Sequence, residues 1–193
     1  MTDIEQKWNR NFSNTEVKDT PCTLLLENQH LLPKTGSALD LASGLGGNAV
    51  RLANLGLTTQ AWDISSTAVS KVNGYSIQKS LPLTAVKLNL EHDELPDLKF
   101  DVIVVSHYLH RTLCEKLPSL LFPDGLLFYQ TFTQLKVKPG GPNNPDFLLR
   151  DGELLTLFRL SLLFIIAKRK TVEILTLVTE TSPSISGASH SHS

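Results

Sequence analysis

The stretch Ala38-Leu39-Asp40-Leu41-Ala42-Ser43-Gly44-Leu45-Gly46-Gly47-Asn48 decides the fold. Its first residues are mostly apolar and indicate a short buried β-strand. Glycines then crowd a tight turn, and a helical pattern of apolar residues begins at Asn48. Glycine lets a backbone come close to a ligand, and the N-terminus of a helix offers unpaired N–H groups. The stretch therefore predicts a strand, a ligand-binding turn and a helix in direct succession.

Strands and helices alternate on either side of this stretch. The expected strands are Ala38–Leu41, Thr58–Ile64, Leu83–Leu90, Phe100–Ser106 and Leu126–Phe132. The expected helices are Asn48–Leu55, a segment from Ser65 to about Asn73-Gly74, and Leu113–Phe122, with Pro123-Asp124-Gly125 as a turn. This alternation predicts an α/β fold with a Rossmann-like, doubly wound parallel sheet. The continuously apolar run Val102–Val105 suits a strand that is buried on both faces.

The two ends of the chain have a different character. Residues 1–32 predict a helical segment, with Thr20-Pro21 as the N-cap and first position of a helix that Pro33 ends. After a loop rich in Gly and Pro, Asp151–Phe158 predicts a short helix. The runs Leu160–Ala167 and Thr171–Thr179 are joined by Lys168-Arg169-Lys170, a connection that permits an antiparallel hairpin but no parallel crossover. The Ser-rich residues 182–193 predict a disordered tail, which leaves residues 1–181 as one domain.

Composition narrows the class of protein. The chain has 193 residues, 41% of them hydrophobic, and a formal net charge of -1, as in ordinary globular proteins. No basic run interleaves with aromatic residues, so we expect no nucleic-acid partner. The longest apolar stretch is too short to span a bilayer, and the N-terminus is unlike a secretory signal, so we expect a cytoplasmic protein. Cys22 and Cys114 predict small core residues, and we expect no metal site, including at His190 and His192.

The glycine turn fits two cofactor patterns. As Gly44-x-Gly46-x-x-Ala49 it matches the dinucleotide fingerprint, with Asp63 as the ribose partner about 20 residues further on. As Asp40-x-Ala42-x-Gly44-x-Gly46 it matches the nucleotide loop of methyltransferases. In the dinucleotide fold, a carboxylate at position 40 would be buried in the first strand without a partner. In the methyltransferase loop Asp40 would help to anchor the polar, cationic end of the cofactor, so we favour that pattern over a dinucleotide site or a turn that binds nothing.

Polar residues at the ends of two other strands complete the candidate cofactor site. Asp63 is the last polar residue of its strand, and its two acceptor oxygens suit a ribose diol. The alternative is that Asp63 is the N-cap of the next helix, a role that Ser65 or Ser66 could also fill. Asn89-Leu90-Glu91 follows the third strand, where a polar group could meet the adenine amine while Leu90 packs on the ring. The alternative for these residues is a solvated, charged turn.

The fourth strand ends in a cluster of polar and aromatic residues. Ser106 is its first polar residue at the carboxyl edge, where such sheets bind ligands. We therefore expect His107 to line the acceptor pocket as a candidate base, with Tyr108 or His110 beside it. The alternative is that these histidines cap the next helix or pack under it. Trp8 and Phe12 are candidates for a lid over the site, with ordinary core packing as the alternative.

From about Trp8 to Phe158 the chain resembles the small class I methyltransferases of the tellurite-resistance type. The motifs that carry the resemblance are Leu32-Pro33-x-x-Gly36-x-Ala38-Leu39-Asp40-Leu41-Ala42-Ser43-Gly44, Asn48-Ala49, Ala61-Trp62-Asp63-Ile64-Ser65, Phe100-Asp101-Val102-Ile103, Pro123-Asp124-Gly125 and Asn144-Pro145-x-Phe147-Leu148-Leu149-x-x-Gly152-Glu153-Leu154. The resemblance implies a seven-stranded sheet, mostly parallel with an antiparallel last strand. It also implies S-adenosyl-L-methionine as the methyl donor and a small-molecule acceptor that reacts through S, N, O or a metalloid oxyanion.

The expected cofactor-binding set is Asp40, Ala42, Ser43, Gly44, Gly46, Asn48, Asp63, Ile64, Asn89, Leu90, Glu91 and Ser106. We expect a monomer or a weak homodimer and no membrane partner. Three positions depart from the group: Ala42 replaces a usual glycine, Gly47 a common arginine, and Ala167-Lys168-Arg169-Lys170 an acidic connection. The last departure leaves open an alternative function, a catalytically degenerate methyltransferase fold that binds a cofactor or a partner without catalysis.

Overall fold

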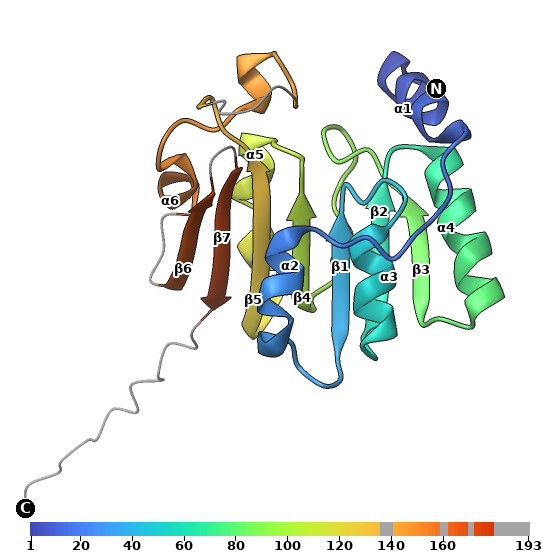
Figure 1. Cartoon of the computed structure of the whole chain (residues 1–193), viewed down its shortest axis with the longest axis horizontal. Helices are drawn as coiled ribbons and strands as arrows, with labels where there is room; N and C mark the ends of the chain where they lie inside the picture. Colours follow the sequence, from blue (N-terminus) through green and yellow to red (C-terminus); the bar gives the residue numbers. More distant parts are fainter. Residues whose placement is uncertain (136–140, 159–161, 170–171, 180–193) are drawn as a thin grey trace, which may run out of the picture.

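Five parallel strands form the centre of the computed structural model, which describes residues 1–135, 141–158, 162–169 and 172–179. They are β1 (Ser37–Leu41), β2 (Thr58–Asp63), β3 (Leu83–Lys87), β4 (Phe100–Ser106) and β5 (Leu121–Phe132). Their order across the sheet is β3-β2-β1-β4-β5, so the direction of winding reverses between β1 and β4 (Figure 1). The predicted α/β, Rossmann-like fold with a parallel sheet is confirmed for these five strands.

Two further strands lie beyond β5. β7 (Val172–Thr179) pairs antiparallel with β5, and β6 (Leu162–Arg169) pairs antiparallel with β7. With them the described sheet has seven strands in the order β3-β2-β1-β4-β5-β7-β6. The short connection between β6 and β7 leaves no room for a parallel crossover. The predicted tail 182–193, which contains His190 and His192, and Lys170 of the predicted connection lie outside the described residues.

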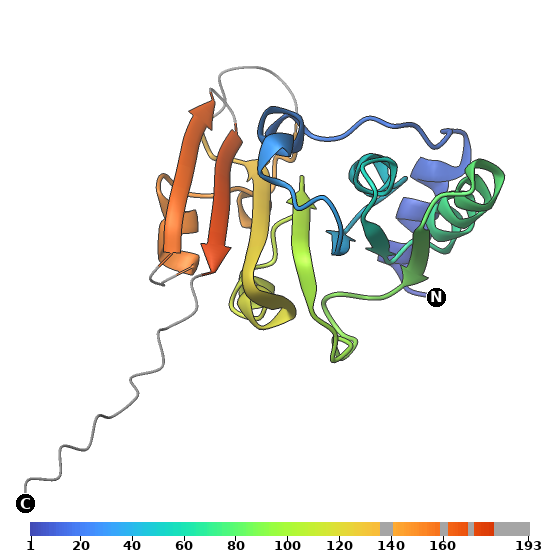
Figure 2. The ribbon, with the colours of Figure 1, turned by 90° about the horizontal axis from the view of Figure 1, so that it is seen from below.

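Helices cover both faces of the sheet. They are α1 (Asp3–Ser13), α2 (Thr23–Asn28), α3 (Gly47–Asn54), α4 (Ser66–Lys79), α5 (Arg111–Cys114) and α6 (Glu153–Leu157), with single 3₁₀ turns η1 (Gln29–Leu31), η2 (Leu117–Leu120) and η3 (Pro145–Phe147). Viewed from below, α2 and α3 lie on one face and α5 with η2 on the other (Figure 2). Within the predicted helical segment 1–32 the structure has α1 and α2, and within the predicted helix Asp151–Phe158 it has the shorter α6.

The two faces follow from the alternation of side chains along each strand. Leu39 and Leu41 pack with Leu117 on the α5 face, whereas Ala38 packs with Leu52 on the α2–α3 face. Because successive residues of a strand point to opposite faces, Asp40 must lie on the α3 face with Ala38. This assignment matters for the site, because it places the carboxylate of Asp40 under the first turn of α3.

Two helix boundaries differ from the prediction because distant side chains determine them. α2 begins at Thr23 rather than at Pro21, and no local side chain caps it. Instead the amide oxygen of Asn48 accepts the N–H of Cys22 at 2.8 Å, and that of Gln130 accepts the N–H of Leu24 at 3.0 Å. α4 does not end near Gly74, because Asn73 donates to and accepts from the backbone of Ala85 in β3.

The region before β5 also differs from the prediction. Leu121 pairs with Phe100 and Leu126 pairs with Val102, so Pro123-Asp124-Gly125 forms a bulge within β5 rather than a turn before it. The predicted helix Leu113–Phe122 is therefore replaced by the short α5, the turn η2 and the start of β5. Cys22 and Cys114 are buried free thiols, as predicted. No helix among the described residues is long and apolar enough to cross a membrane, and no cluster of three metal-ligating side chains is found among them.

Candidate active site

A cavity of about 350 Å³ opens at the carboxyl ends of β1, β2, β3 and β4. Ligand-binding cavities are commonly about 300–1,000 Å³. The cavity lies where the winding of the sheet reverses, which is where open α/β sheets bind ligands. Its sixteen lining residues are Ile4, Trp8, Phe12, Ala42, Ser43, Gly44, Leu45, Asp63, Ile64, Leu88, Asn89, Leu90, Glu91, Ser106, His107 and Tyr108.

Most of the predicted site residues lie in this lining. They are Ala42, Ser43, Gly44, Asp63, Ile64, Asn89, Leu90, Glu91 and Ser106, together with the acceptor candidates His107 and Tyr108. Asp40, Gly46, Asn48 and His110 do not line the cavity. Sequence reasoning missed Ile4, Leu45 and Leu88. Ile4 had a usable signal, because it precedes Trp8 and Phe12 on one face of a helix at a spacing of four residues.

Every second residue of the loop after β1, from Ala42 to Gly46, is in the left-handed conformation. Ala42 has a φ of 55°, Gly44 of 53° and Gly46 of 69°. Glycine adopts this conformation without strain, whereas a residue with a Cβ such as Ala42 does so at a cost. A Cβ at Gly44 would lie 3.1 Å from the ring of Phe12, so the loop and α1 approach closely there.

Asp40 supports the glycine loop from behind rather than facing the cavity. The residue is fully buried, and its carboxylate accepts the side-chain amide of Asn48 at 3.1 Å and the N–H of Ala49 at 3.0 Å. Burial raises the pKa of Asp40 to about 7, the two hydrogen bonds oppose the shift and the charge of Asp63 adds to it. Asp40, which was expected to help anchor the polar end of a cofactor, therefore lies behind the lining, because β1 points this side chain under α3.

Asn48 connects Asp40 to the cavity. The same amide nitrogen also donates to the hydroxyl of Ser106 at 3.0 Å, and Ser106 lines the cavity. The amide oxygen accepts the N–H of Cys22. One buried side chain thus holds together β1, the end of β4 and the start of α2. Asn48, a predicted cofactor residue, thus lies behind the lining and reaches the cavity only through its hydrogen bond to Ser106.

Asp63 ends β2 with both carboxylate oxygens held by backbone donors. One oxygen accepts the N–H of Gly44 at 2.7 Å and the other that of Ser65 at 2.8 Å. Burial raises the pKa of Asp63, and the backbone donors lower it. The N-cap of α4 is Ser65, whose hydroxyl accepts the N–H of Ala68, so Asp63 is not the cap. Asp63 instead faces the cavity and fixes the position of the glycine loop.

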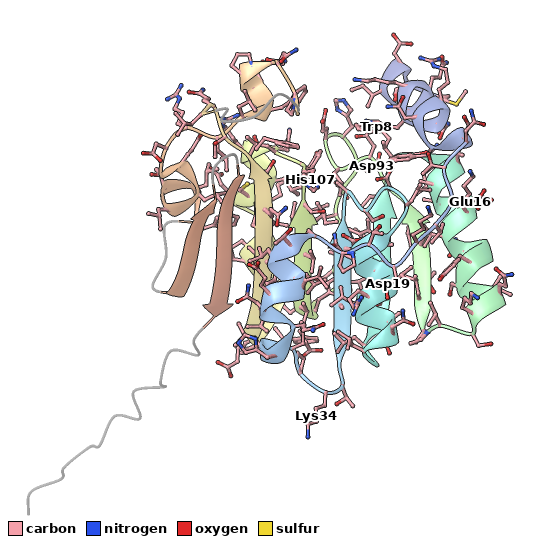
Figure 3. The ribbon with its side chains drawn as sticks, in the orientation of Figure 1. Trp8, Glu16, Asp19, Lys34, Asp93 and His107 are labelled. Carbon is pink, nitrogen blue, oxygen red and sulfur yellow. The ribbon has the colours of Figure 1, made fainter. Side chains whose placement is uncertain are left out.

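The N-terminal helix α1 covers the cavity with one apolar face. Ile4, Trp8 and Phe12 line the cavity, and the rings of Trp8 and Phe12 stack with centroids 5.5 Å apart. Figure 3 shows Trp8 projecting from α1 and His107 at the end of β4, both at the same edge of the sheet. Trp8 and Phe12, the two candidates for a lid, thus both lie in the cavity lining.

Three polar side chains, those of Asn9, Glu5 and Lys71, fasten α1 to the rest of the molecule. The amide oxygen of Asn9 accepts the hydroxyl of Ser65 at 2.7 Å at the start of α4. Glu5, which is buried, pairs with Lys87 at 2.8 Å. The ammonium of Lys71 donates to the carbonyls of Phe12, Ser13 and Thr15, where α1 ends. Cations are favourable at that end of a helix, so α1 is held at both of its ends.

The end of β4 presents polar atoms that lack partners in the described part of the chain. His107 has a φ of 58°, its N–H donates to the carbonyl of Gln130 and its ring lies 5.2 Å from that of Phe132. Burial lowers the pKa of His107. The Tyr108 hydroxyl and Nδ1 of His110 are buried without a hydrogen-bond partner among the described residues. Burial, followed by the charge of Glu91, raises the pKa of Tyr108.

Arg111 fixes the segment that follows β5 against this end of β4. Its guanidinium pairs with both carboxylate oxygens of Glu153, at 2.7 and 3.1 Å. It also donates to the carbonyls of Asp146 at 2.7 Å and Leu148 at 3.0 Å. Sequence reasoning assigned Arg111 no role, since nothing local links it to a partner 42 residues away.

Gly47 has no space for a side chain. A Cβ there would lie 2.5 Å from the carbonyl oxygen of Thr20, because the chain between α1 and α2 crosses the start of α3. The resemblance led us to expect the loss of one contact where arginine is common. The structure shows why no larger residue fits: the backbone of Thr20 fills that position.

Comparisons with known proteins agree with this geometry. Residues 39–126 match the family described as "Methyltransferase domain". TehB from Haemophilus influenzae has a similar structure, with a TM-score of 0.69, 13% identity and coverage of 90% of this chain and 67% of that chain. An S-adenosylmethionine-dependent methyltransferase from Aquifex aeolicus gives a TM-score of 0.67 at 14% identity, with coverage of 92% and 99%. Coclaurine N-methyltransferase bound to N-methylheliamine and SAH gives 0.58 at 16% identity, with coverage of 74% and 46%.

A search of curated protein sequences found no match. At these identities the likeness to solved structures establishes the fold, and the domain match covers the glycine loop, Asp63 and β4. The domain match over residues 39–126 and the shared fold support a class I methyltransferase.

Proposed function

We propose that this chain transfers a methyl group from S-adenosylmethionine to a small-molecule acceptor, and that it is of the tellurite-resistance type. One observation carries the proposal. The cavity at the switch point of the sheet brings together the glycine loop, Asp63 and Asn89-Leu90, which come from three different strand ends. These residues supply the groups that a nucleoside attached to an amino acid requires. The motif resemblance and the fold shared with TehB support the choice of subgroup.

The lining residues divide naturally between the parts of the cofactor. The Asp63 carboxylate suits the ribose diol, and Asn89 with Leu90 suits the adenine ring. The backbone of Ser43 and Gly44 also lines the cavity, and it suits the amino-acid end of the cofactor. Asp40, Gly46 and Asn48 support this cradle from behind. When bound, the cofactor supplies an activated methyl group on a sulfonium centre.

Methyl transfer requires little of the protein beyond the correct placement of the cofactor and the acceptor. Methyl transfer is an in-line displacement, so alignment of the acceptor and exclusion of water contribute most. Trp8 and Phe12 cover the cavity and exclude water. His107 and Tyr108 line the cavity at the end of β4, where the acceptor would enter. His107, whose pKa is lowered by burial, is neutral near pH 7 and can accept a proton from a thiol, amine or hydroxyl.

The proposal extends to the organisation of the chain. We propose that residues 1–181 act as one domain, and that the antiparallel strands beside β5 form the back wall of the acceptor side. We also propose that the protein acts as a monomer or a weak homodimer and needs no nucleic acid. The near-neutral net charge of -1 supports the last point.

Calorimetry with S-adenosylhomocysteine and with NAD tests the cofactor assignment. We expect micromolar binding of S-adenosylhomocysteine and no measurable binding of NAD, and the reverse result would refute the proposal. A mass-spectrometric product screen with S-adenosylmethionine then tests turnover. Binding without turnover would point to the degenerate, non-catalytic alternative. Once an acceptor is known, His107→Ala should keep cofactor affinity and melting temperature but lower kcat, whereas a loss of melting temperature alone would assign His107 to structure.

A further inference from the structure

We propose that Phe132, at the end of β5, is a positioning residue for His107, and that the segment 141–153, fixed by Arg111, holds the ring of Phe132 in place. The inference rests on the proposed methyl transfer, in which His107 is the candidate base. It concerns the acceptor side alone, because none of these residues belongs to the set assigned to the cofactor.

The backbone of His107 is fixed, whereas its imidazole is only partly covered where it lines the cavity (Figure 3). Its φ is 58°, a left-handed conformation that a residue with a Cβ keeps only when its surroundings hold it there. The N–H of His107 donates to the carbonyl of Gln130 at 2.8 Å and provides part of that restraint. A general base must also be aimed at the proton that it accepts, so the imidazole needs a contact that restricts its rotamers.

The ring of Phe132 provides this second contact. Its centroid lies 5.2 Å from that of the His107 imidazole, and the two ring planes are inclined at 41°. Rings at such a spacing are in contact and attract each other. Phe132 follows Gln130 by two residues on the same strand. β5 therefore holds both the backbone and the side chain of His107.

The segment after β5 holds Phe132 in turn. A Cβ on Gly141 would lie 2.9 Å from the Phe132 ring, so the backbone approaches that ring more closely than a residue with a side chain could. The N–H of Leu149, which is fully buried, donates to the carbonyl of Phe132 at 2.9 Å. The carbonyl of Leu149 accepts the N–H of Gln134 at 2.9 Å. The ring of Phe132 thus has little freedom to move away from His107.

Arg111 connects this segment to the end of β4. It follows His107 by four residues, and its guanidinium donates to the carbonyls of Asp146 and Leu148 and to both carboxylate oxygens of Glu153. Figure 1 shows the segment (orange) next to α5, where Arg111 lies. A planar fork of donors can hold several acceptors in one fixed arrangement, which an ammonium group cannot. The contacts therefore form a closed ring that restrains the imidazole without supplying an atom to the reaction.

NMR titration of the His107 ring tests the contact in the full-length chain and needs no acceptor. S-adenosylhomocysteine is kept bound, His107→Gln assigns the signal, and the exposed His30 and His92 serve as internal references. Burial lowers the pKa of His107, and no charged group among the described residues contributes to that shift. Phe132→Ala removes apolar cover, so the pKa of His107 should rise toward its ordinary value. Phe147→Ala removes an exposed ring of the same segment and should leave it unchanged.

Two further variants keep the test valid if Phe132→Ala does not fold, which thermal unfolding would show. Phe132→Leu keeps an apolar side chain but no flat ring, so the pKa of His107 should rise by a smaller amount. Arg111→Lys keeps the positive charge but lacks the planar fork of donors. It should loosen the segment and raise the pKa of His107 in the same direction, without any change in the charges around it.

A double-mutant cycle tests whether Phe132 acts through His107. The probes are selenite, thiophenol, aniline and catechol, and the one that gives the most methylated product by mass spectrometry is used. Phe132→Ala should lower kcat about tenfold and change the KM for S-adenosylmethionine less than about twofold, because it misaligns the base without touching the cofactor site. In a His107→Ala chain the same substitution should lower kcat less than about twofold.

The outcomes separate this inference from the proposed function. An unchanged His107 titration in both Phe132 variants, or an equal shift in Phe147→Ala, would show that the ring does not restrain His107. Additive losses in the cycle would show that Phe132 acts apart from His107, and an unchanged titration in Arg111→Lys would remove the clamp. Each of these results leaves the methyltransferase assignment intact, whereas failure of S-adenosylhomocysteine to bind the parent chain refutes the proposed function itself.

Discussion

The two ends of the cavity differ in how their polar atoms are paired. Around the glycine loop, Asp40, Asn48 and Asp63 have every side-chain oxygen engaged with an N–H donor of the protein. At the end of β4, the Tyr108 hydroxyl and Nδ1 of His110 are buried without a partner among the described residues. The first end is complete without a ligand, whereas the second leaves hydrogen-bonding capacity unused.

This difference suits the two tasks of a group-transfer site. Because the cofactor is the same in every turnover, a rigid, prearranged site can bind it. The conformational entropy that such a site loses is lost during folding and not during binding. Buried polar atoms without partners cost free energy unless a ligand satisfies them. The comparison therefore predicts that substitutions near the loop change both stability and cofactor affinity, whereas substitutions at the end of β4 change turnover.

Asn48→Ala should have the largest effect. It would leave the N–H of Cys22 and one oxygen of Asp40 without their partner inside the core, so we expect a loss of about 2–4 kcal/mol in the free energy of unfolding. Urea denaturation measures it. Asn54→Ala, which removes an exposed side chain of the same helix that donates to Asp19, should cost less than about 1 kcal/mol. Equal costs would contradict the picture of a rigid cradle.

Asp63→Ala should come next. It removes the acceptor for the N–H groups of Gly44 and Ser65, so we expect S-adenosylhomocysteine to bind about 1–3 kcal/mol more weakly. The loss of these two bonds should also lower the melting temperature. The exposed Asp97→Ala is the control for a change of charge alone. Unchanged affinity in Asp63→Ala, measured by calorimetry, would remove Asp63 from the cofactor site.

Asp40 should make stability depend on pH. Burial raises the pKa of Asp40 from 3.8 to about 7 in the folded protein, whereas the unfolded chain keeps a value close to the lower one. Between these values the folded state holds more protons, so the free energy of unfolding should fall as pH rises, by on the order of 1 kcal/mol per pH unit. Asp40→Asn should lack this slope. A wild-type slope of the opposite sign, after subtraction of the variant, would contradict the burial of a protonated carboxyl.

Tyr108→Phe tests the other end of the cavity, where the hydroxyl of Tyr108 is buried. Because the hydroxyl has no protein partner among the described residues, its removal should leave stability unchanged or raise it by less than about 1 kcal/mol. Tyr129→Phe is the matched control, since the Tyr129 hydroxyl donates to the carbonyl of Tyr108 at 2.9 Å and its loss should destabilise the protein. Thermal unfolding of both variants distinguishes the two hydroxyls.

Ala42→Gly should have the smallest effect. Ala42 is held at a φ of 55°, where glycine is not strained, so the substitution should stabilise the protein by roughly 0.5 kcal/mol. Ala49→Gly, in the right-handed α3, should instead destabilise it by about 1 kcal/mol. The opposite signs make the pair a sensitive test by chemical denaturation. Destabilisation by both substitutions would mean that the methyl group of Ala42 packs better than its conformation costs.

Much of the cavity lining was predictable because strand ends meet at one edge. Asp63, Asn89 and Ser106 each follow a recognisable strand, and parallel strands bring their carboxyl ends together. The place of Trp8 and Phe12 in the lining was predictable in part, because they are large apolar residues on a polar helix. The periodicity of apolar residues and the order of the strands were enough for these assignments, because neither depends on contacts between distant side chains.

What the sequence could not predict are contacts between residues far apart along the chain. Asn48 determines the start of α2 from 26 residues away, and Gln130 from 106 residues away. The pairing of Asp40 with Ala49 depends on how closely α3 returns over β1, which no local pattern encodes. Propensity placed the end of α4 at Gly74, but the bonds between Asn73 and Ala85 carry the helix further. Tertiary contacts overrode local preference in each of these cases.

The close approach of Thr20 to Gly47 limits how the sequences of related chains can vary. With the Thr20 carbonyl where a Cβ would stand, the residue at position 47 and the path of the backbone at position 20 cannot change independently. A related chain that carries arginine at the position of Gly47 must route the segment between α1 and α2 differently, through insertion, deletion or loss of the crossing. Covariation between that side chain and the length of this segment would therefore mark, in any set of relatives, which ones share this N-terminal path.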